Sequence, residues 1–544
     1  MEPPANADSI IKQGRMIDVE TTRRNFLKLS LAGTAAVAGA SFLAGCSPTS
    51  TAPSSGDSAQ TDDAKIEASQ EESCDIVVVG SGTSGTCAAI RAAELGANVI
   101  WLEKTDAKGG TSIYTEAMAG VNSQLQKSAD ISFDENSVFY DLMDYQDWGG
   151  LGKVVMAFVQ NSGETLDWIA EKGAEVYASP VPGYPATKYL HMASVNGEYS
   201  RIGQGILEPL WKVGEGMSNL DFRPKTPAIG LAIDNGAVTG VYAQSSDGTI
   251  TKISAQSVIL ASGGFASNQE MYERYTQSPY ELIKFWGLEG RDGDGINMGM
   301  KAGANTHALR CLSYSYGAVD GTSSFDDEVN VWFSWYALLT VNADGDRFMD
   351  ESIVLGEDTS KRNIALTAQT AAYVIADEAY VKQCADLGAF NWGTGTTKGE
   401  LRESIKACSG IVKADTIEAL AEAMGVDTQT LQASVDEYNA IAAGEKEDNR
   451  FKTPGDALIP VKEGPFYAAK LVASGYGTIG GLTTNEKFQV TTESGEVIPG
   501  LYATGTDNGS MYYISYPMAV MGGTLQGFGA TSGRMAAEDA CANL

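Results

Sequence analysis

The chain has 544 residues and a formal net charge of −31. This length allows two or three domains with a large core, and the acidic surplus argues against nucleic acid as a partner and against polybasic attachment to anionic lipid. The seven cysteines are scattered and include no C-x-x-C pair, which argues against an iron–sulfur cluster, a c-type haem or any other metal site.

Residues 1–45 predict an export signal. Arg23 and Arg24 precede an apolar stretch of small residues from Leu29 to Gly45, the pattern of a twin-arginine signal. Leu43-Ala44-Gly45-Cys46 is typical of a lipoprotein processing site, so we expect a lipidated Cys46 to hold the protein at the outer face of the cytoplasmic membrane. Residues 46–73 are rich in Ser, Thr and Asp and predict a flexible tether.

A short apolar strand followed by three glycines predicts a dinucleotide-binding turn. Ile76 to Val79 suits a strand buried on both faces, and Gly80, Gly82 and Gly85 follow at G-x-G-x-x-G spacing. The first glycine permits a tight turn, the second lets the backbone approach a pyrophosphate, and the third lets the next helix pack closely. Residues 83–95 read as that helix, whose N-terminus would face the phosphates.

A second apolar run, residues 98–102, ends in Glu103, where a carboxylate is expected to bind ribose hydroxyls. The order of strand, glycines, helix, strand and acid favours a dinucleotide site over an ordinary turn. The motif alone does not separate NAD from FAD.

The continuation of the motif carries a family resemblance. Glu103-Lys104 is followed by Gly109-Gly110-Thr111-Ser112 and by Ala119-Gly120. These stretches resemble the flavoprotein subunits of the fumarate reductase/succinate dehydrogenase family, in which they hold FAD. Non-covalent FAD is expected, because the histidine that usually forms the covalent link is not apparent.

Later segments extend this resemblance. Two apolar runs flank Asn235-Gly236 and predict a hairpin over 228–243. An apolar strand then enters Ala261-Ser262-Gly263-Gly264, and Gly293-Asp294-Gly295 opens a helix, both as in the family. Near the C-terminus, residues 497–505 and Gly522-Gly523-Thr524-Leu525 resemble the family segments that return to the flavin, followed by a predicted helix over 531–538.

The resemblance implies an α/β fold, with a Rossmann-like FAD-binding domain at 74–313 and 478–544. An α+β capping domain at 314–477 would be inserted into it, with helical stretches around 364–386 and 415–443. The residues that the resemblance and the motifs assign to the cofactor are Gly80, Ser81, Gly82, Ser84, Gly85, Glu103, Lys104, Gly109, Gly110, Thr111, Ser112, Gly120, Ala261, Ser262, Gly263, Gly264, Asp294, Gly295, Gly505, Thr506, Asp507, Gly522, Gly523, Thr524 and Leu525.

The substrate motifs of the family are not preserved. Fumarate-reducing members clamp two carboxylates with histidines and arginines, and these positions fall here on residues such as Val520 and Gly477. The family's proton-relay positions fall in residues 331–334, which contain neither Glu nor Arg. A loose alignment retains one family arginine, matched by Arg362 or alternatively by Lys361, so fumarate is a poor candidate substrate.

This chain has aromatic residues in the segments where the family has its substrate-binding histidines and arginines. Each aromatic residue is either a core residue or part of a substrate pocket. As a group they suggest a larger, flatter and less charged substrate. Tyr516, ahead of Gly522-Gly523, resembles the tyrosine of the tyrosine–glycine pair that polarises the ketone in ketosteroid dehydrogenases of this superfamily. The aromatic residues are Tyr314, Tyr316, Trp332, Phe333, Trp335, Tyr336, Tyr512, Tyr513 and Tyr516, and Tyr476 lies beside Gly477 in the sequence.

The favoured interpretation is an FAD-dependent reductase of an activated C=C bond in an aryl or bulky enoate that serves as a respiratory electron acceptor. Arg362, Tyr516, Tyr513 and Tyr476 are the candidate catalytic residues. Electrons would come from a separate carrier, such as a membrane quinol-oxidising cytochrome. One alternative is a ketosteroid or enone reductase or dehydrogenase, and another is a non-catalytic electron-carrier lipoprotein with bound flavin.

Overall fold

The computed structural model describes residues 66–180, 185–356, 358–391, 395–397 and 400–544. Residues 68–544 form one compact unit. The predicted export signal, Cys46 and most of the predicted tether lie outside the described residues. Within the described ranges, no helix is both long enough and apolar enough to cross a membrane.

A six-stranded sheet forms the centre of the nucleotide-binding part. Its order is β24-β25-β12-β2-β3-β8, and all neighbours are parallel except β24 and β25. The inner strands β2, β3 and β12 are buried at every position, which explains their continuously apolar sequences. The bounds are β2 Ile76–Val79, β3 Val99–Leu102, β8 Leu220–Arg223, β12 Ser257–Leu260, β24 Gln489–Thr491 and β25 Val497–Ala503.

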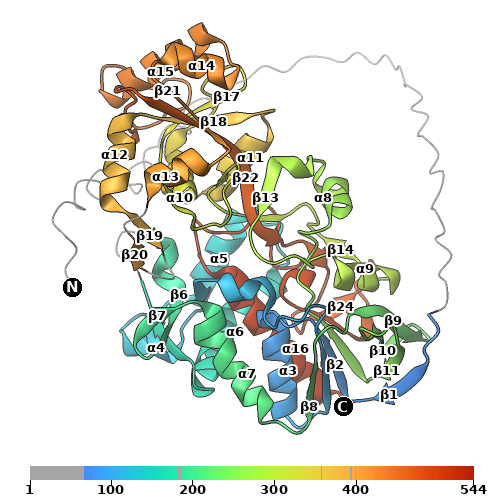
Figure 1. Ribbon diagram of the computed structural model, residues 1–544. Helices are drawn as coiled ribbons and strands as arrows, with labels where there is room; N and C mark the ends of the chain where they lie inside the picture. The colour runs from blue at the N-terminus through green and yellow to red at the C-terminus, as the bar shows by residue number, and fades with distance from the viewer. Residues whose placement is uncertain (1–65, 181–184, 357, 392–394, 398–399) are drawn as a thin grey trace, which may run out of the picture. The chain divides into compact units, whose positions relative to one another are not determined.

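Two helices rich in small residues pack against each other beside this sheet (Figure 1). They are α3 (Thr83–Glu94) and α16 (Thr524–Ala542). A Cβ added to Gly533 would lie 2.1 Å from the carbonyl oxygen of Ser84, so the two backbones touch. The last helix begins seven residues before its predicted start, because Gly523 caps it in the left-handed conformation with φ of 79°.

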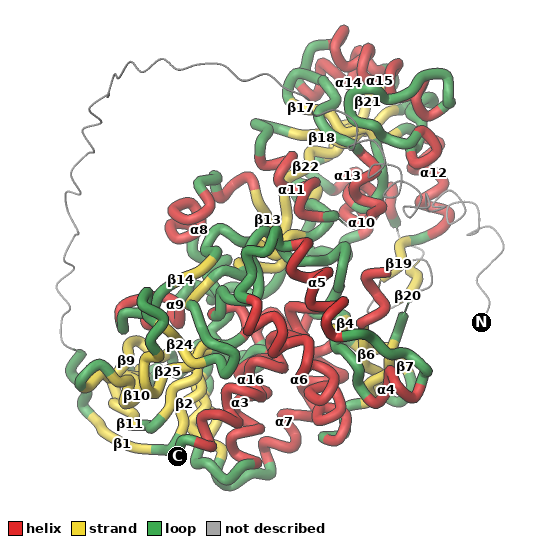
Figure 2. Tube along the Cα trace, turned by 180° about the vertical axis from the view of Figure 1, so that it is seen from behind, coloured by secondary structure: helices red, strands yellow, loops and turns green. Residues whose placement is uncertain are grey.

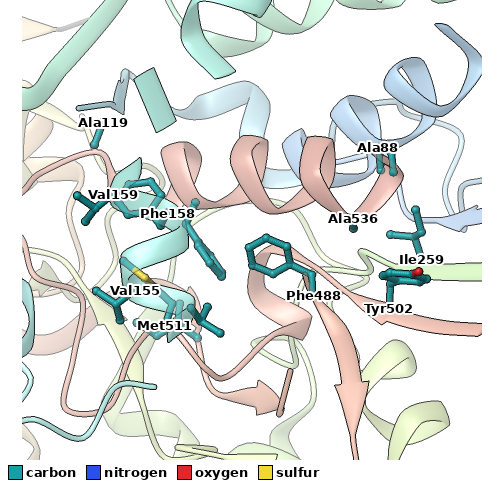
Figure 3. Close-up of a cluster of buried hydrophobic side chains, with 14 of the residues drawn as sticks. Ala88, Ala119, Val155, Phe158, Val159, Ile259, Phe488, Tyr502, Met511 and Ala536 are labelled. Carbon is teal, nitrogen blue, oxygen red and sulfur yellow. The ribbon is translucent and has the colours of Figure 1, made fainter. Parts of the chain in front are cut away.

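The core between α16 and α6 (Gly152–Glu171) is aromatic. Figure 3 shows Phe158 of α6 and Phe488 pointing toward each other. The ring of Phe528 on α16 contacts both, with centroid distances of 6.2 and 5.9 Å. This edge-to-face packing fixes α16 and therefore the loop that precedes it.

A second sheet, ordered β1-β11-β10-β9, lies at the edge of the nucleotide-binding part. Asn235 and Gly236 have φ of 50° and 81°, as the predicted hairpin turn requires. Four residues that we predicted as tether form β1 instead, because they pair in parallel with the free edge of β11. The bounds are β1 Gln70–Ser73, β9 Ala228–Asp234, β10 Ala237–Gln244 and β11 Ile250–Ser254.

Residues 113–225 add four short antiparallel strands and four helices. His191 in β6 is fully buried and lies 2.7 Å from Ser123 Oγ and 3.1 Å from the carbonyl oxygen of Tyr189. Burial lowers the pKa of His191 to about 4, so this is a structural histidine. The bounds are β4 Ala117–Ala119, β5 Glu175–Ala178, β6 Leu190–Val195, β7 Glu198–Ser200, α4 Gln124–Ser128, α5 Glu135–Tyr145, α6 as above and α7 Glu208–Glu215.

Residues 314–477, predicted as a cap and called the cap segment below, are built around one long strand. This strand, β22 (Phe466–Thr478), pairs with β16, β18 and β21 through its first half and with β13 and β15 through its second half. Its neighbours are β13 Ile283–Phe285, β15 Leu312–Tyr314, β16 Ala318–Val319, β18 Ala372–Ala376 with β17 Leu339–Asn342 beside it, and β21 Ile411–Ala414.

Figure 2 shows the helices of the cap segment around this sheet. The predicted helical stretch at 364–386 is helical at its two ends, in α11 and α12, and wrong in its middle, because the apolar run Ala372–Ala376 forms β18 against β22. The stretch at 415–443 is two helices, since Gly425 ends the first with φ of 74°. The bounds are α10 Glu328–Ser334, α11 Thr359–Thr367, α12 Glu378–Leu387, α13 Leu401–Ala407, α14 Ile417–Met424 and α15 Thr428–Ala442.

The remaining elements are short connections: α8 Gln269–Thr276, α9 Asp294–Lys301, β14 Thr306–His307, β19 Ala389–Asn391, β20 Gly395–Thr397 and β23 Gly481–Leu482.

A buried ionic network joins the segments of the cap. The Arg347 guanidinium lies 2.6 Å from Glu351 and 3.0 Å from Asp448, and all three side chains are buried. Burial raises the pKa of Asp448, but hydrogen bonds from the Phe451 N–H, from Thr453 and from Arg347 outweigh it and lower the pKa to about 2. Residues 347–351, which carry Arg347 and Glu351, are therefore a structural anchor.

Candidate active site

Three glycines at the end of β2 have three different roles. Gly80 has φ of 104°, and a Cβ there would lie 2.3 Å from the carbonyl oxygen of Ala261. A Cβ on Gly85 would lie 2.0 Å from the carbonyl oxygen of Gly80, so the helix packs directly on the turn. A Cβ on Gly82 would meet nothing closer than Ser112 Oγ, at 3.5 Å. The middle glycine is thus not closely packed by protein atoms, which is consistent with the approach of a pyrophosphate to the backbone.

Hydrogen bonds tie this turn to the loop after β3. Ser81 Oγ donates to Glu103 at 2.6 Å and accepts from the Gly109 N–H at 2.9 Å. Lys104 pairs with Asp294 at 2.8 Å, which brings the β3 loop to the start of α9. The predicted ribose-binding acid is buried and held in place before any ligand binds.

A carboxylate connects three other predicted cofactor segments. Asp507 accepts the N–H groups of Ser262 at 2.5 Å and Gly264 at 3.1 Å, and Ser262 Oγ accepts the Gly295 N–H at 3.0 Å. Complete burial raises the pKa of Asp507, and these hydrogen bonds oppose that rise. The glycine-rich turns after β12, β25 and before α9 therefore form one rigid unit.

The start of α16 faces the same region. Gln526 accepts a hydrogen bond from Thr83 Oγ1 at 2.5 Å and donates to Thr115 Oγ1 at 2.8 Å. The buried hydroxyls of Tyr512 and Thr524 lie near each other without a regular hydrogen bond. A polar ligand edge at this helix N-terminus would satisfy them.

We call the set of backbone turns just described the flavin cradle: residues 80–85, 109–112, 261–264, 293–295, 505–507 and 522–524. Its donors are mainly backbone N–H groups with small or hydroxyl side chains, which suit the phosphates and polar ring edge of FAD. The other predicted cofactor residues also lie in or beside these turns: Ser84, Gly110, Thr111, Ala261, Gly263, Gly505, Thr506, Gly522 and Leu525, with Gly120 packed on Leu166.

Tyr516 lies next to the flavin cradle. The Gly523 N–H donates a hydrogen bond to Tyr516 Oη at 2.5 Å. The rings of Tyr516 and Tyr476 are 6.4 Å apart and nearly perpendicular. The structure thus brings together two of the four predicted catalytic residues.

An aromatic group continues from this pair into the cap segment. Phe325 is at its centre, with ring centroids 5.5 Å from Tyr476, 4.9 Å from Trp335 and 6.2 Å from Trp286. The Trp335 Nε1 donor is buried and has no hydrogen-bond partner among the described residues. We call Trp286, Tyr316, Phe325, Trp335, Tyr476 and Tyr516 the aromatic group.

The other two predicted catalytic residues lie elsewhere. Tyr513 stacks on His307 at 5.6 Å and approaches Arg310, away from Tyr516. Arg362 is completely buried in the cap segment, where it donates to the carbonyl oxygen of Ser334 and its Nε has no partner among the described residues. Burial lowers the pKa of Arg362 to about 10.

Most of the remaining predicted aromatics are core residues. Tyr314, Trp332 and Phe333 are buried in the hydrophobic core of the cap segment, and Tyr336 packs against that core. Tyr512 is buried beside α16. About half of the aromatic residues singled out in the sequence are therefore core residues and not part of a substrate pocket.

Sequence reasoning missed a partly buried cation beside the aromatic group. Arg291 donates to the carbonyl oxygen of Tyr476 at 2.6 Å, and its side chain lies 3.6 Å from the position of a Cβ on Gly263. Burial lowers the pKa of Arg291 to about 10. Its place just before the Gly293 turn, next to a flavin-binding motif, was the signal that could have identified it. Phe325 and Trp286 were missed too, because neither lies in a family motif.

Known proteins share both the sequence and the fold. A vinyl phenol reductase from Lactiplantibacillus plantarum is 31% identical over 483 residues, which cover 86% of this chain and 96% of that protein. A urocanate reductase from Eggerthella lenta is 28% identical over 80% of this chain and 70% of its own length.

Two solved structures show the same fold. The open conformation of a flavocytochrome c3 fumarate reductase matches with a TM-score of 0.69 and 23% identity, over 87% of this chain and 79% of that one. A 3-ketosteroid Δ1-dehydrogenase from Sterolibacterium denitrificans matches with a TM-score of 0.67 and 21% identity, over 87% of this chain and 100% of that one. These matches confirm the predicted α/β flavoprotein fold.

The family model described as the FAD binding domain matches residues 75–522. Its match confirms FAD as the cofactor and the predicted resemblance to the fumarate reductase flavoproteins. The chain belongs to this FAD-binding family and is a fumarate reductase-like oxidoreductase that acts on CH–CH bonds.

Proposed function

We propose that the protein reduces the activated C=C bond of an aryl enoate or a similar flat, bulky alkene. The observation that carries this proposal is the aromatic group beside the flavin cradle, with Tyr516 and Gly523 at one end. Planar aromatic surfaces suit a planar substrate, and the arginine clamp expected for a small dianion is absent from the matching positions. The relatives named for vinyl phenol and urocanate reduction support an aromatic substrate.

Bound FAD supplies hydride transfer from N5 to an electron-poor carbon. The chain's own contribution is to bind and polarise the alkene. A substrate carbonyl oxygen would accept a hydrogen bond from the Tyr516 hydroxyl, whose oxygen is held in place by the Gly523 N–H, and this donor would stabilise developing negative charge. Such donors typically contribute about 3 kcal/mol to the transition state. Arg291, which is partly buried and donates to the carbonyl oxygen of Tyr476, adds a positive field at the same end.

The proposed setting is outside the cytoplasm. The twin-arginine pattern and Cys46 in the sequence support export and lipid attachment at the outer face of the cytoplasmic membrane. In this setting the substrate serves as a respiratory electron acceptor. A separate membrane quinol-oxidising cytochrome supplies the electrons.

The test is an anaerobic reoxidation assay on the purified holoprotein. The bound flavin is reduced, and cinnamates, enones and fumarate are added separately while the oxidised flavin absorbance is followed. Fast reoxidation by a cinnamate with fumarate inert is the expected result. Reoxidation by fumarate alone would contradict the proposal, and reoxidation by none of the compounds would favour the non-catalytic electron carrier.

A cyclic enone or ketosteroid is the second candidate substrate. The contact between Tyr516 and Gly523 favours it, because the Gly523 N–H holds a tyrosine hydroxyl that also suits a ring ketone as a hydrogen-bond donor. Reoxidation by enones but not by any carboxylate would select this candidate.

A further inference from the structure

Three charged side chains lie close together at the edge of the cap segment: Glu116, Arg201 and Asp326. Arg201 Nη2 lies 2.5 Å from Asp326 Oδ2, across 125 residues of sequence. The Ile202 N–H donates to the carbonyl oxygen of Thr115 at 2.8 Å, which places Arg201 beside Glu116. Thr115 in turn accepts the hydrogen bond from Gln526 on α16. This charged cluster is therefore fixed to the same elements that form the flavin cradle.

The carboxyl group of Glu116 is the unusual member of this cluster. It forms no hydrogen bond and no ion pair within 4 Å to any residue in the described part of the chain. Burial raises the pKa of Glu116 to about 7, Arg201 opposes this rise, and Asp326 reinforces it. Tyr199 is the other titratable group that faces it. The Glu116 side chain is only partly buried, so its carboxyl group is open to a hydrogen-bond donor from a ligand.

The charged cluster adjoins the aromatic group. Asp326 directly follows Phe325, whose ring lies at the centre of that group. Successive ring contacts lead from Phe325 to Tyr476 and then to Tyr516, which bonds to Gly523. The aromatic group therefore has polar groups at two ends: Tyr516 with Gly523 at one, and at the other Asp326, which pairs with Arg201 in the charged cluster that includes Glu116.

We propose that Glu116 accepts a hydrogen bond from a hydroxyl group on the aromatic ring of the substrate, so that the enzyme selects hydroxyaryl alkenes. This inference rests on the proposed function and names its substrate class. A neutral hydroxyl donor fits the site better than an ion does. An anionic substituent would meet two carboxylates, and an ammonium group would be desolvated beside Arg201.

The test is a pair of binding titrations on the oxidised holoprotein. Para-hydroxycinnamate and para-methoxycinnamate are added at pH 8, and the perturbation of the flavin spectrum gives each Kd. The two compounds differ in the hydrogen-bond donor at the ring position. We expect the hydroxy compound to bind about tenfold more tightly, because charge-assisted hydrogen bonds are strong in a buried site.

Variants at Glu116 separate hydrogen bonding from packing. Glu116→Leu removes the acceptor and is expected to abolish the preference, whereas Glu116→Gln keeps the volume and an acceptor oxygen and is expected to retain about threefold. In the unchanged protein the preference should shrink from pH 8 to pH 6, as the carboxyl is protonated below its pKa of about 7. The control is Glu171→Gln at the exposed end of α6, which should leave both Kd values unchanged.

The outcomes also separate this proposal from the proposed function. Equal Kd values in the unchanged protein, or a preference that survives in both Glu116 variants, would overturn the role of Glu116. If those same compounds still reoxidise the reduced flavin, the proposed function stands without it. If neither compound binds nor reoxidises the flavin, both proposals fail together.

Discussion

The flavin cradle and the aromatic group are built in opposite ways. The cradle is made of backbone N–H groups and glycines whose Cβ positions are blocked, as at Gly80 and Gly85. The aromatic group is made of side chains from five separate segments, with Phe325 at the centre. A site made of backbone tolerates few residue types, whereas a site made of side chains can change its ligand by substitution. This contrast explains why a common cofactor site can stand beside a variable substrate site.

The largest expected effect is a loss of FAD, and it tests the close backbone packing of the flavin cradle. Gly80→Ala should prevent FAD retention, because the new Cβ would lie 2.3 Å from the carbonyl oxygen of Ala261. The matched control is Gly96→Ala, which has a similar φ of 96° but no atom within 4 Å of the added Cβ. The control should cost about 1 kcal/mol of the free energy of unfolding and keep its flavin. Flavin absorbance per protein and thermal unfolding measure both, and equal flavin loss in the two variants would contradict the close-approach argument.

The second prediction concerns the rigidity of the cap segment. Arg347→Met should lower the free energy of unfolding by about 3–5 kcal/mol, because Glu351 and Asp448 would stay buried without their cation. Lys406→Met removes the exposed Lys406–Glu403 pair and should cost less than about 1 kcal/mol. Urea unfolding of both variants checks this. Similar midpoints for the two would mean that the buried network does not stabilise the cap segment.

The third prediction tests the side-chain part of the site. Tyr516→Phe should slow flavin reoxidation by the preferred alkene about 100-fold, since it removes one donor to the developing negative charge. Tyr140→Phe, on the exposed side of α5, serves as the control and should change the rate less than about twofold. Stopped-flow absorbance gives both rates. A Tyr516 variant that reacts at the unchanged rate would remove the tyrosine–glycine pair from the mechanism.

The smallest expected effect is a pH dependence. The pKa of Asp448 is depressed to about 2, so its contribution to stability is present above its unfolded value near 4 and is lost as pH falls toward 2. The unchanged protein should therefore lose stability below about pH 4 more steeply than Asp448→Asn does. Urea unfolding at a series of pH values compares the two. Parallel curves down to pH 3 would show that Asp448 is not the group that titrates.

The cofactor, the fold class and the enzyme class could be predicted from the sequence because their signals are local. The strand at Ile76–Val79, the three glycines and Glu103 lie within 30 residues, and each motif has one backbone solution. The hairpin at Asn235-Gly236 was predicted for the same reason.

The substrate side could not be predicted as well, because its contacts join distant segments. Glu116, Arg201 and Asp326 are separated by 85 and 125 residues, and no local pattern connects them. Tyr513 and Tyr516 are three residues apart, yet the ring of Tyr513 packs on His307 and the ring of Tyr516 packs on Tyr476. The strand Ala372–Ala376 was predicted as helix, since its apolar run is too short to reveal that β22 lies beside it.

The strand β22 also has a mechanical consequence. One unbroken strand carries the sheet of the cap segment at Phe466 and ends at Thr478, whose hydroxyl accepts the Phe265 N–H at 2.8 Å next to the flavin turn. A strand transmits displacement along its length far better than a loop does, because its backbone is extended and paired on both sides. A displacement of the cap segment along β22 would therefore be carried to the Phe265 backbone, directly after the Gly264 turn.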